Sequence, residues 1–249
     1  MSDSLRVIGS YLSPYVRKVL VCLELKGIAY EIDPIVPFYG NEAFAQLSPL
    51  RRIPVLIDGE VTLTDSTIIC EYLEESRPRP PLYPKTPALR ARARWLEEFA
   101  DSRLGDVFIW RLFNQFVIRR AVWGEKPDAE LVKRTLEVDA PQALDYLEGE
   151  LPQEGFLFGD VSIADVSIAS FFSNAAYARF EIDAARWPKA AGFVGRVLAL
   201  DAFERLKRLE DKLLRTPIAE HRRTLADSGA PLSADSFASE SPRRGVMPI

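Results

Sequence analysis

Apolar residues in the first eighty positions alternate between short runs typical of strands and spacings typical of helices. Leu5–Ile8 and Tyr30–Val36 are strand candidates. The segment between them places apolar residues at i, i+3, i+4 and i+7, at Val16, Val19, Leu20 and Leu23. This spacing predicts a helix that begins after Ser13, a preferred N-cap, and ends near Gly27.

A hairpin and a second amphipathic helix complete this first region. Two apolar runs flank Asp58-Gly59, a dipeptide that favours a tight turn between strands. Asp65 and Ser66 then precede a run with helical spacing. With a short helix before the hairpin, the order is β-α-β-α-β-β-α, which predicts an α/β domain over residues 1–80.

A stretch with five prolines separates this domain from a region of different character. Because proline cannot continue a helix, we place a linker at residues 81–87. From 88 to 215 the pattern predicts helices alone, one of them opened by Ser162 and Asp165 at capping-box spacing. Residues 216–249 have weak periodicity and are expected to form a C-terminal tail.

Composition and charge narrow the chemistry that this chain can perform. The 249 residues are 47% hydrophobic with a formal net charge of -4, which disfavours a broad nucleic-acid surface. Cys22 and Cys70 form no CxxC pair, and the single histidine, His221, excludes a multi-histidine metal site and disfavours a Ser-His triad. No apolar run approaches the roughly 18 residues that span a membrane, and the start lacks a secretory signal pattern. We therefore expect a cytoplasmic protein without a metal, a nucleic-acid partner or a membrane segment.

The start of the first predicted helix carries the first chemical signal. In a thioredoxin-like unit a helix at this place would carry Cys-x-x-Cys, but Ser13 and Val16 occupy those positions, which excludes dithiol redox chemistry there. A serine hydroxyl beside the free N–H groups of a helix N-terminus can donate to an anion, and such surroundings lower a thiol pKa from about 8.5. Ser13 is therefore a candidate to stabilise a bound thiolate. The alternative is that it only caps its helix.

Two further groups suit an extended ligand that carries an amino-acid head group. Pro54 opens a strand and tolerates a cis bond, which would turn the N–H and C=O of Ile53 outward to pair with a peptide. Ser66 lies at a helix N-terminus that can bind a carboxylate, and Asp65 can hold an ammonium group. The alternatives are an edge-strand proline and ordinary helix capping.

These motifs together resemble the N-terminal domain of cytosolic glutathione transferases. They are Ser13-Pro14-Tyr15, Ile53-Pro54-Val55-Leu56 and Asp65-Ser66, in that order. The linker, the helical region and the capping box extend the resemblance to about residues 5–210. It implies a thioredoxin-like α/β domain followed by an all-α helical C-terminal domain, the glutathione transferase architecture, in a serine-type member.

The resemblance implies which residue stabilises the thiolate of glutathione. Ser13 would hold the thiolate, as in the serine-type classes. Tyr11 is the alternative, because other classes use a tyrosine near this point. We rank Ser13 first because it occupies the helix cap.

The same resemblance implies how the rest of glutathione is bound. Ile53, next to Pro54, would pair its backbone with the cysteinyl residue, and Arg52 would lie near the glycyl carboxylate. Asp65 and Ser66 would bind the γ-glutamyl end, although many members have Glu where this chain has Asp65. Because the loop at 37–41 lacks the lysine of serine-type relatives, glycyl binding rests on Arg52 or is weak.

The activity implied by the resemblance is transfer of glutathione, as a co-substrate, to an apolar electrophile in cytoplasmic detoxification by a homodimer. The electrophile pocket is expected to include aromatic side chains at Tyr11, Tyr15, Phe38, Phe108 and Phe113. Two alternatives stay open. One is a glutathione-dependent lyase similar to bacterial β-aryl etherases, and the other is a non-catalytic binding or interaction protein of the same fold.

Overall fold

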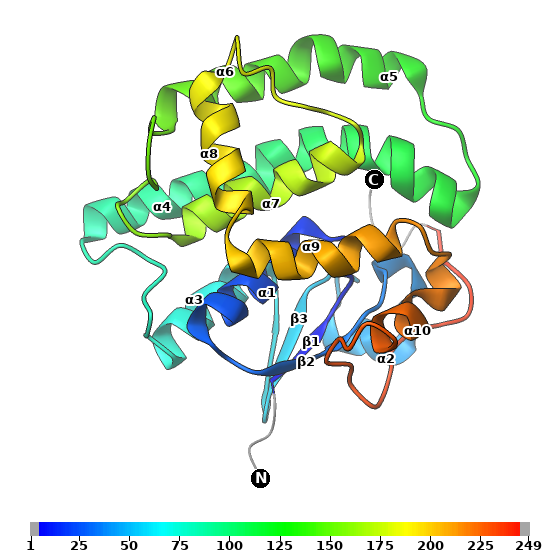
Figure 1. The fold of residues 1–249 in the computed structure, drawn as a ribbon. Coiled ribbons are helices and arrows are strands. Elements are labelled where there is room, and N and C mark those ends of the chain that lie inside the picture. Colours follow the sequence, from blue (N-terminus) through cyan, green and yellow to red (C-terminus); the bar gives the residue numbers. More distant parts are fainter. Residues whose placement is uncertain (1–4, 245–249) are drawn as a thin grey trace. The chain divides into compact units, whose positions relative to one another are not determined.

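The computed structural model describes residues 5–244 of the chain (Figure 1). They divide into two units, which we call the sheet unit and the helical unit. The sheet unit contains the residues up to Pro80 and those from Arg205 onward, and the helical unit is Pro81–Glu204. The expected boundaries at residues 80 and 215 stay a prediction, and in this division the segment from Arg205 onward is grouped with the sheet.

The sheet unit begins with β1 (Leu5–Ile8), α1 (Pro14–Lys26), β2 (Tyr30–Asp33), η1 (Pro37–Tyr39), α2 (Glu42–Leu47), β3 (Val55–Asp58), β4 (Val61–Thr64) and α3 (Ser66–Ser76). The strand order is β2-β1-β3-β4. β1 and β2 are parallel, whereas β3 runs antiparallel to both of its neighbours. α1 and α3 lie side by side (Figure 1). The expected thioredoxin-like alternation of strands and helices is confirmed.

Local sequence explains where α1 begins and ends. Pro14 fits the first turn, where its missing N–H is not needed, and Gly27 adopts a φ of 65° so that its N–H can donate to Glu24 O. The apolar face predicted from the spacing is fully buried. Burial of each such side chain stabilises the fold by roughly 1.5–3 kcal/mol.

The helical unit contains α4 (Pro87–Phe99), the π-type helical segment η2 (Ala100–Trp123), α5 (Ala129–Arg134), η3 (Thr135–Asp139), α6 (Ala140–Glu150), α7 (Ile163–Tyr177) and α8 (Pro188–Leu198). α7 packs against α4, η2 and α8, and most of its side chains are buried. Its start is fixed by the capping box, in which the Ser162 N–H donates to Asp165 Oδ2 at 2.8 Å. The expected helical character of this region is confirmed.

The chain continues through α9 (Asp201–Leu213), η4 (Ile218–Glu220) and α10 (His221–Ala226). The second part of α9 belongs to the sheet unit, where Glu210 forms an ion pair with Arg17 and Arg205 forms one with Glu24. After α10, an extended segment runs beside β2 and is drawn in red in Figure 1. The described residues after 215, which were expected to form a C-terminal tail, are grouped with the sheet unit.

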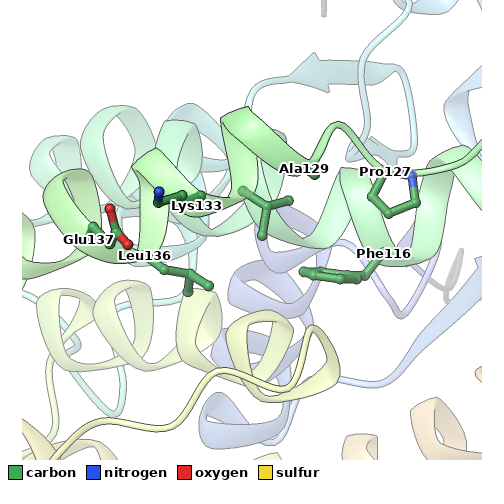
Figure 2. A pocket seen from close by; sticks show the side chains of 7 residues that line it. Phe116, Pro127, Ala129, Lys133, Leu136 and Glu137 are labelled. Carbon is green, nitrogen blue, oxygen red and sulfur yellow. The ribbon is translucent and has the colours of Figure 1, made fainter.

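A hollow of about 390 Å³ lies in the helical unit. Figure 2 shows Phe116 of η2 and Leu136 of η3 on its two sides. Its lining consists of Phe116, Pro127, Ala129, Val132, Lys133, Leu136 and Glu137. None of the five aromatic residues expected to line an electrophile pocket belongs to this lining.

Candidate functional site

Three polar segments of the sheet unit meet at one end of the sheet. The strand register pairs Ile8 with Val55 and Val55 with Thr64. The loop after β1, the residues before β3 and the residues after β4 therefore leave the sheet at the same end. The expected site residues of these segments are Ser13, Ile53, Pro54, Asp65 and Ser66.

Gly9 brings the first two of these segments into close contact. It directly follows β1 and has a φ of 152°. A Cβ atom at Gly9 would lie 2.5 Å from Cγ2 of Val16 and 3.1 Å from Cβ of Ile53. The absence of a side chain therefore lets the first turn of α1 and the residue before Pro54 approach each other across this loop.

Ser13 is the N-cap of α1 and is partly exposed. Its Oγ accepts a hydrogen bond from the Val16 N–H at 3.4 Å. Because the hydroxyl acts here as an acceptor, its own proton can still be donated to a ligand. An anion beside Ser13 would also face the positive end of a helix of 13 residues.

The Ile53–Pro54 peptide bond is cis, the form that Pro54 was expected to tolerate. Pro54 is buried, and Ile53 is partly exposed just before β3. Within residues 5–244, the N–H and C=O of Ile53 have no hydrogen-bond partner. An extended peptide can therefore pair with this backbone without displacing a bond of the protein.

Asp65 is the N-cap of α3 and has a φ of 77°, which is unusual for a residue with a side chain. Its Oδ1 accepts hydrogen bonds from the N–H groups of Thr67 at 2.9 Å and Ile68 at 3.3 Å. The carboxylate is exposed, whereas the neighbouring Ser66 is buried. Strained backbone of this kind clusters at functional sites, and the exposed carboxylate is available to an ammonium group.

Arg52 lies in a loop that Ser48 holds in place. The Ser48 Oγ accepts from the Arg52 N–H at 3.0 Å and donates to the Arg52 carbonyl at 2.8 Å. The Arg52 side chain is exposed, and among the described residues its guanidinium has no ion-pair partner. The adjacent Arg51 instead pairs with Glu42 at 3.1 Å. Arg52 is therefore the cation that this loop leaves available to a carboxylate.

Tyr11 differs from Ser13 in its surroundings, because its side chain is fully buried. Burial raises the pKa of Tyr11 well above its usual value, and the negative charges of Glu24 and Glu210 act in the same direction. Tyr30 lies in the same environment, and its pKa is raised for the same main reason. A phenol in this position stays neutral and enclosed by protein.

The other aromatic residues expected near an electrophile are largely enclosed as well. Phe38 is buried in the sheet unit, and Tyr15 is partly exposed. Phe108 and Phe113 are buried in the helical unit, where Phe108 packs against Phe172 at a ring separation of 4.9 Å. These positions suit core packing, and their role as pocket lining stays a prediction.

A buried ion pair lies beneath the start of α1, and the partner of Arg17 in this pair could not be identified from the sequence. Arg17, one turn after Ser13, donates from Nε to Glu210 Oε1 at 2.7 Å and from Nη2 to Oε2 at 2.9 Å. Both side chains are 1% exposed. On the same helix, the buried Lys18 donates to Thr67 Oγ1 at 3.1 Å, which links α1 to the first turn of α3. The spacing of Arg17 and Lys18 showed that they lie on α1, but nothing nearby in the sequence indicated their partners.

Within residues 5–244, no group of three or more histidine, cysteine, aspartate or glutamate residues could hold a metal ion. In the same residues, no helix is both long enough and apolar enough to cross a membrane.

Comparisons with known proteins show similarity to glutathione S-transferases in sequence and in fold. Residues 7–81 match the family model described as the N-terminal domain of glutathione S-transferase. The maleylacetoacetate isomerase of Rattus norvegicus is 32% identical over 75% of this chain and 84% of its own length. A glutathione S-transferase structure from Rhodospirillum rubrum has a TM-score of 0.74 at 29% identity, and the match covers 81% of this chain and 91% of that one. One from Methylobacterium radiotolerans, in complex with glutathione sulfonate, has a TM-score of 0.66 at 25% identity, covering 81% and 93%.

Proposed function

Because this chain belongs to the glutathione S-transferase family, we propose that it binds glutathione at the end of the sheet where β1, β3 and β4 meet, and activates the thiol for attack on an apolar electrophile. The observation that carries the proposal is the strand register, which brings the Ser13, Ile53 and Asp65 segments to that one end. Each segment offers a different group: a hydroxyl at a helix cap, an unpaired peptide backbone and an exposed carboxylate.

The peptide part of glutathione suits the backbone and charges of this site. Its cysteinyl residue would pair with the N–H and C=O of Ile53 beside the cis bond to Pro54. Its ammonium group would contact Asp65, and its γ-glutamyl carboxylate would lie at the N-terminus of α3, beside Ser66. The glycyl carboxylate would then be held by Arg52.

Ser13 is the residue that we assign to thiolate stabilisation. A thiol with a pKa of about 8.5 is about 3% ionised at pH 7, and a pKa about two units lower raises that fraction to about three quarters. The hydroxyl proton of Ser13 and the N-terminus of α1 both favour a negative sulfur. The enclosed phenol of Tyr11, with its raised pKa, supports the choice of Ser13 over Tyr11.

The proposal extends to the setting of the reaction. It assigns the chain to cytoplasmic detoxification as a homodimer, with glutathione as a co-substrate and no metal in the reaction. The protein's contribution is to position the two reactants and to stabilise the thiolate.

A second candidate function is isomerisation by the same thiolate. It is favoured by the 32% identity to a relative named maleylacetoacetate isomerase. Ether cleavage and a non-catalytic role are the other outcomes that an activity panel must separate. Turnover of maleylacetoacetate, of a model aryl ether and of an aryl halide distinguishes the three catalytic options, and glutathione binding without turnover indicates the fourth.

The test combines calorimetry with glutathione and turnover of an aryl halide, for the wild type and for Ser13→Ala and Tyr11→Phe. Loss of one donor to a developing anion typically lowers kcat by about 100-fold or more. We expect such a loss for Ser13→Ala, with little change in glutathione affinity, whereas Tyr11→Phe keeps its activity.

Thr86→Ala is the matched control for the loss of a helix cap, because Thr86 Oγ1 accepts from the Leu89 N–H at the same 3.4 Å. It should change stability alone. Full activity of Ser13→Ala would overturn the assignment of Ser13, and failure of the wild type to bind glutathione would overturn the proposed function.

A further inference from the structure

We call residues 231–243 the strap. Its first residues, 231–233, lie beside the outer edge of β2 in the sheet unit (Figure 1). The Ile32 N–H donates to Pro231 O at 2.7 Å, and the Ser233 N–H donates to Ile32 O at 3.0 Å. These bonds form a parallel bridge between Ile32 and Leu232. The strap thus covers an edge whose backbone groups would otherwise be open to another strand.

The strap then follows the segment 37–41, between β2 and α2. The Asn41 N–H donates to Phe237 O at 2.9 Å, the Ser239 N–H to Tyr39 O at 2.6 Å and the Arg243 N–H to Phe38 O at 2.9 Å. The Phe237 side chain packs against the buried cluster of Ile8, Ile35, Phe44 and Val55. Backbone bonds therefore tie the strap to this segment, and the Phe237 side chain fixes it to the core of the sheet unit.

Asp33, the last residue of β2, anchors the strap. Its carboxylate is 0% exposed and accepts from Arg222 Nη1 at 3.1 Å, Ser236 Oγ at 2.8 Å and the Phe237 N–H at 2.7 Å. A buried carboxylate is tolerated when it is paired and hydrogen-bonded, and all three of these donors come from residues after α9. Loss of its charge would therefore loosen the strap at its centre.

The far end of the strap connects to the loop that contains Arg52. Glu42 forms ion pairs with Arg243 of the strap and with Arg51, and Arg51 Nη1 also donates to Gly40 O at 3.5 Å. Arg243 and Arg51 both hold the pKa of Glu42 below its usual value. Glu42 is thus shared between the strap and the residue next to Arg52.

We propose that the strap is a positioning element of the ligand site: it holds segment 37–42 and, through Glu42, fixes the loop that presents Arg52 to a carboxylate. The identity of that carboxylate as the glycyl end of glutathione rests on the proposed function. The hold on segment 37–42 does not, because it follows from contacts within the protein. Asp33 and Arg243 are accordingly positioning residues that act through the loop.

The first test is amide hydrogen exchange of the full chain without ligand, for Asp33→Asn and Arg243→Ala. Arg243 is 41% exposed, so its variant should fold even if Asp33→Asn does not. We expect exchange in residues 37–42 to be about threefold faster in Arg243→Ala and at least about tenfold faster in Asp33→Asn, with β1 and β3 unchanged. Arg223→Ala is the control, because Arg223 is 85% exposed and pairs only at 3.9 Å with Asp227. Unchanged exchange in residues 37–42 of Arg243→Ala would overturn the proposal.

The second test is the kinetic split between glutathione affinity and turnover. We expect the KM for glutathione to rise about fivefold in Arg243→Ala, with kcat and the KM for the electrophile unchanged, and Arg243→Lys to restore it. Faster exchange with an unchanged glutathione KM would overturn the link to Arg52. If the wild type does not bind glutathione, the proposed function fails, and the exchange experiment still decides whether the strap holds segment 37–42.

Discussion

Ser13 and Ser162 both precede helices as N-caps, but they use their hydroxyl groups in different ways. Ser162 is buried and donates its hydroxyl proton to Asp165 Oδ2 at 2.5 Å, and Asp165 also accepts from the Leu157 N–H at 2.9 Å. Ser13 is partly exposed and only accepts, at 3.4 Å. The Ser162 hydroxyl at the start of α7 is therefore fully used within the fold. The Ser13 hydroxyl at the start of α1 can still donate to a ligand.

The largest effect should come from removing the buried charge that supports α1. Glu210→Ala leaves Arg17 enclosed without its bidentate partner, so we expect the free energy of unfolding to fall by about 3–5 kcal/mol. Asp211→Ala is the matched control, because this exposed neighbour pairs with Lys207 on the surface and contributes less than about 1 kcal/mol. Denaturant unfolding measures both. Equal stabilities would show that the buried pair does not support α1.

The next effect separates the two serines directly. Ser162→Ala breaks the closed capping box, and we expect it to lower the free energy of unfolding by about 2 kcal/mol while leaving kcat of the folded protein unchanged. Ser13→Ala should lower stability by about 1 kcal/mol or less. Denaturant unfolding and steady-state kinetics of both variants check this. A loss of kcat in folded Ser162→Ala would contradict the assignment of Ser162 to structure alone.

A smaller effect is expected at Asp65, the N-cap of α3, whose carboxylate is exposed to a ligand as the Ser13 hydroxyl is. Asp65→Gly relieves the positive φ but removes the carboxylate, so the two effects on stability should cancel to within about 1 kcal/mol. The KM for glutathione should rise about tenfold, because an ammonium group loses its partner. Steady-state kinetics at varied glutathione measures this, and an unchanged KM would assign Asp65 to capping alone.

The smallest effect is the pH dependence of the stability of the residues after α9. Burial lowers the pKa of His221 below its usual value, so the neutral form is favoured in the folded state. Stability should therefore be lost as the pH falls below about 6.5, by at most about 1.4 kcal/mol per pH unit. Hydrogen exchange of α10 at several pH values measures this. His221→Gln should abolish the dependence, and if the dependence persists it comes from another group.

Features encoded by neighbouring residues could be predicted from the sequence. Each of these signals acts within a few residues: Ser13-Pro14, Asp58-Gly59 and the capping-box spacing at Ser162. The helices and strands that begin or end at these signals were therefore predicted. The meeting of the polar clusters at one end of the sheet depends on the register of β1 with β3 and of β3 with β4, which the structure shows.

Long-range contacts could not be predicted in this way. Arg17 and Glu210 are 193 positions apart, and Asp33 and Arg222 are 189 apart, so no local spacing indicates either pair. The strap binds mainly through its backbone and in extended form, which leaves little periodicity to detect. The positive φ of Asp65 likewise depends on how β4 meets α3 in the folded chain, which no residue type reveals.

The most direct test of the central claim is the pKa of the glutathione thiol when bound, measured by ultraviolet absorbance of the thiolate across pH. In the wild type we expect a value one to two units below the usual value of about 8.5, and in Ser13→Ala a return toward that value. Tyr11→Phe should behave as the wild type. An unchanged thiol pKa in Ser13→Ala, or a shift that disappears only in Tyr11→Phe, would contradict the account.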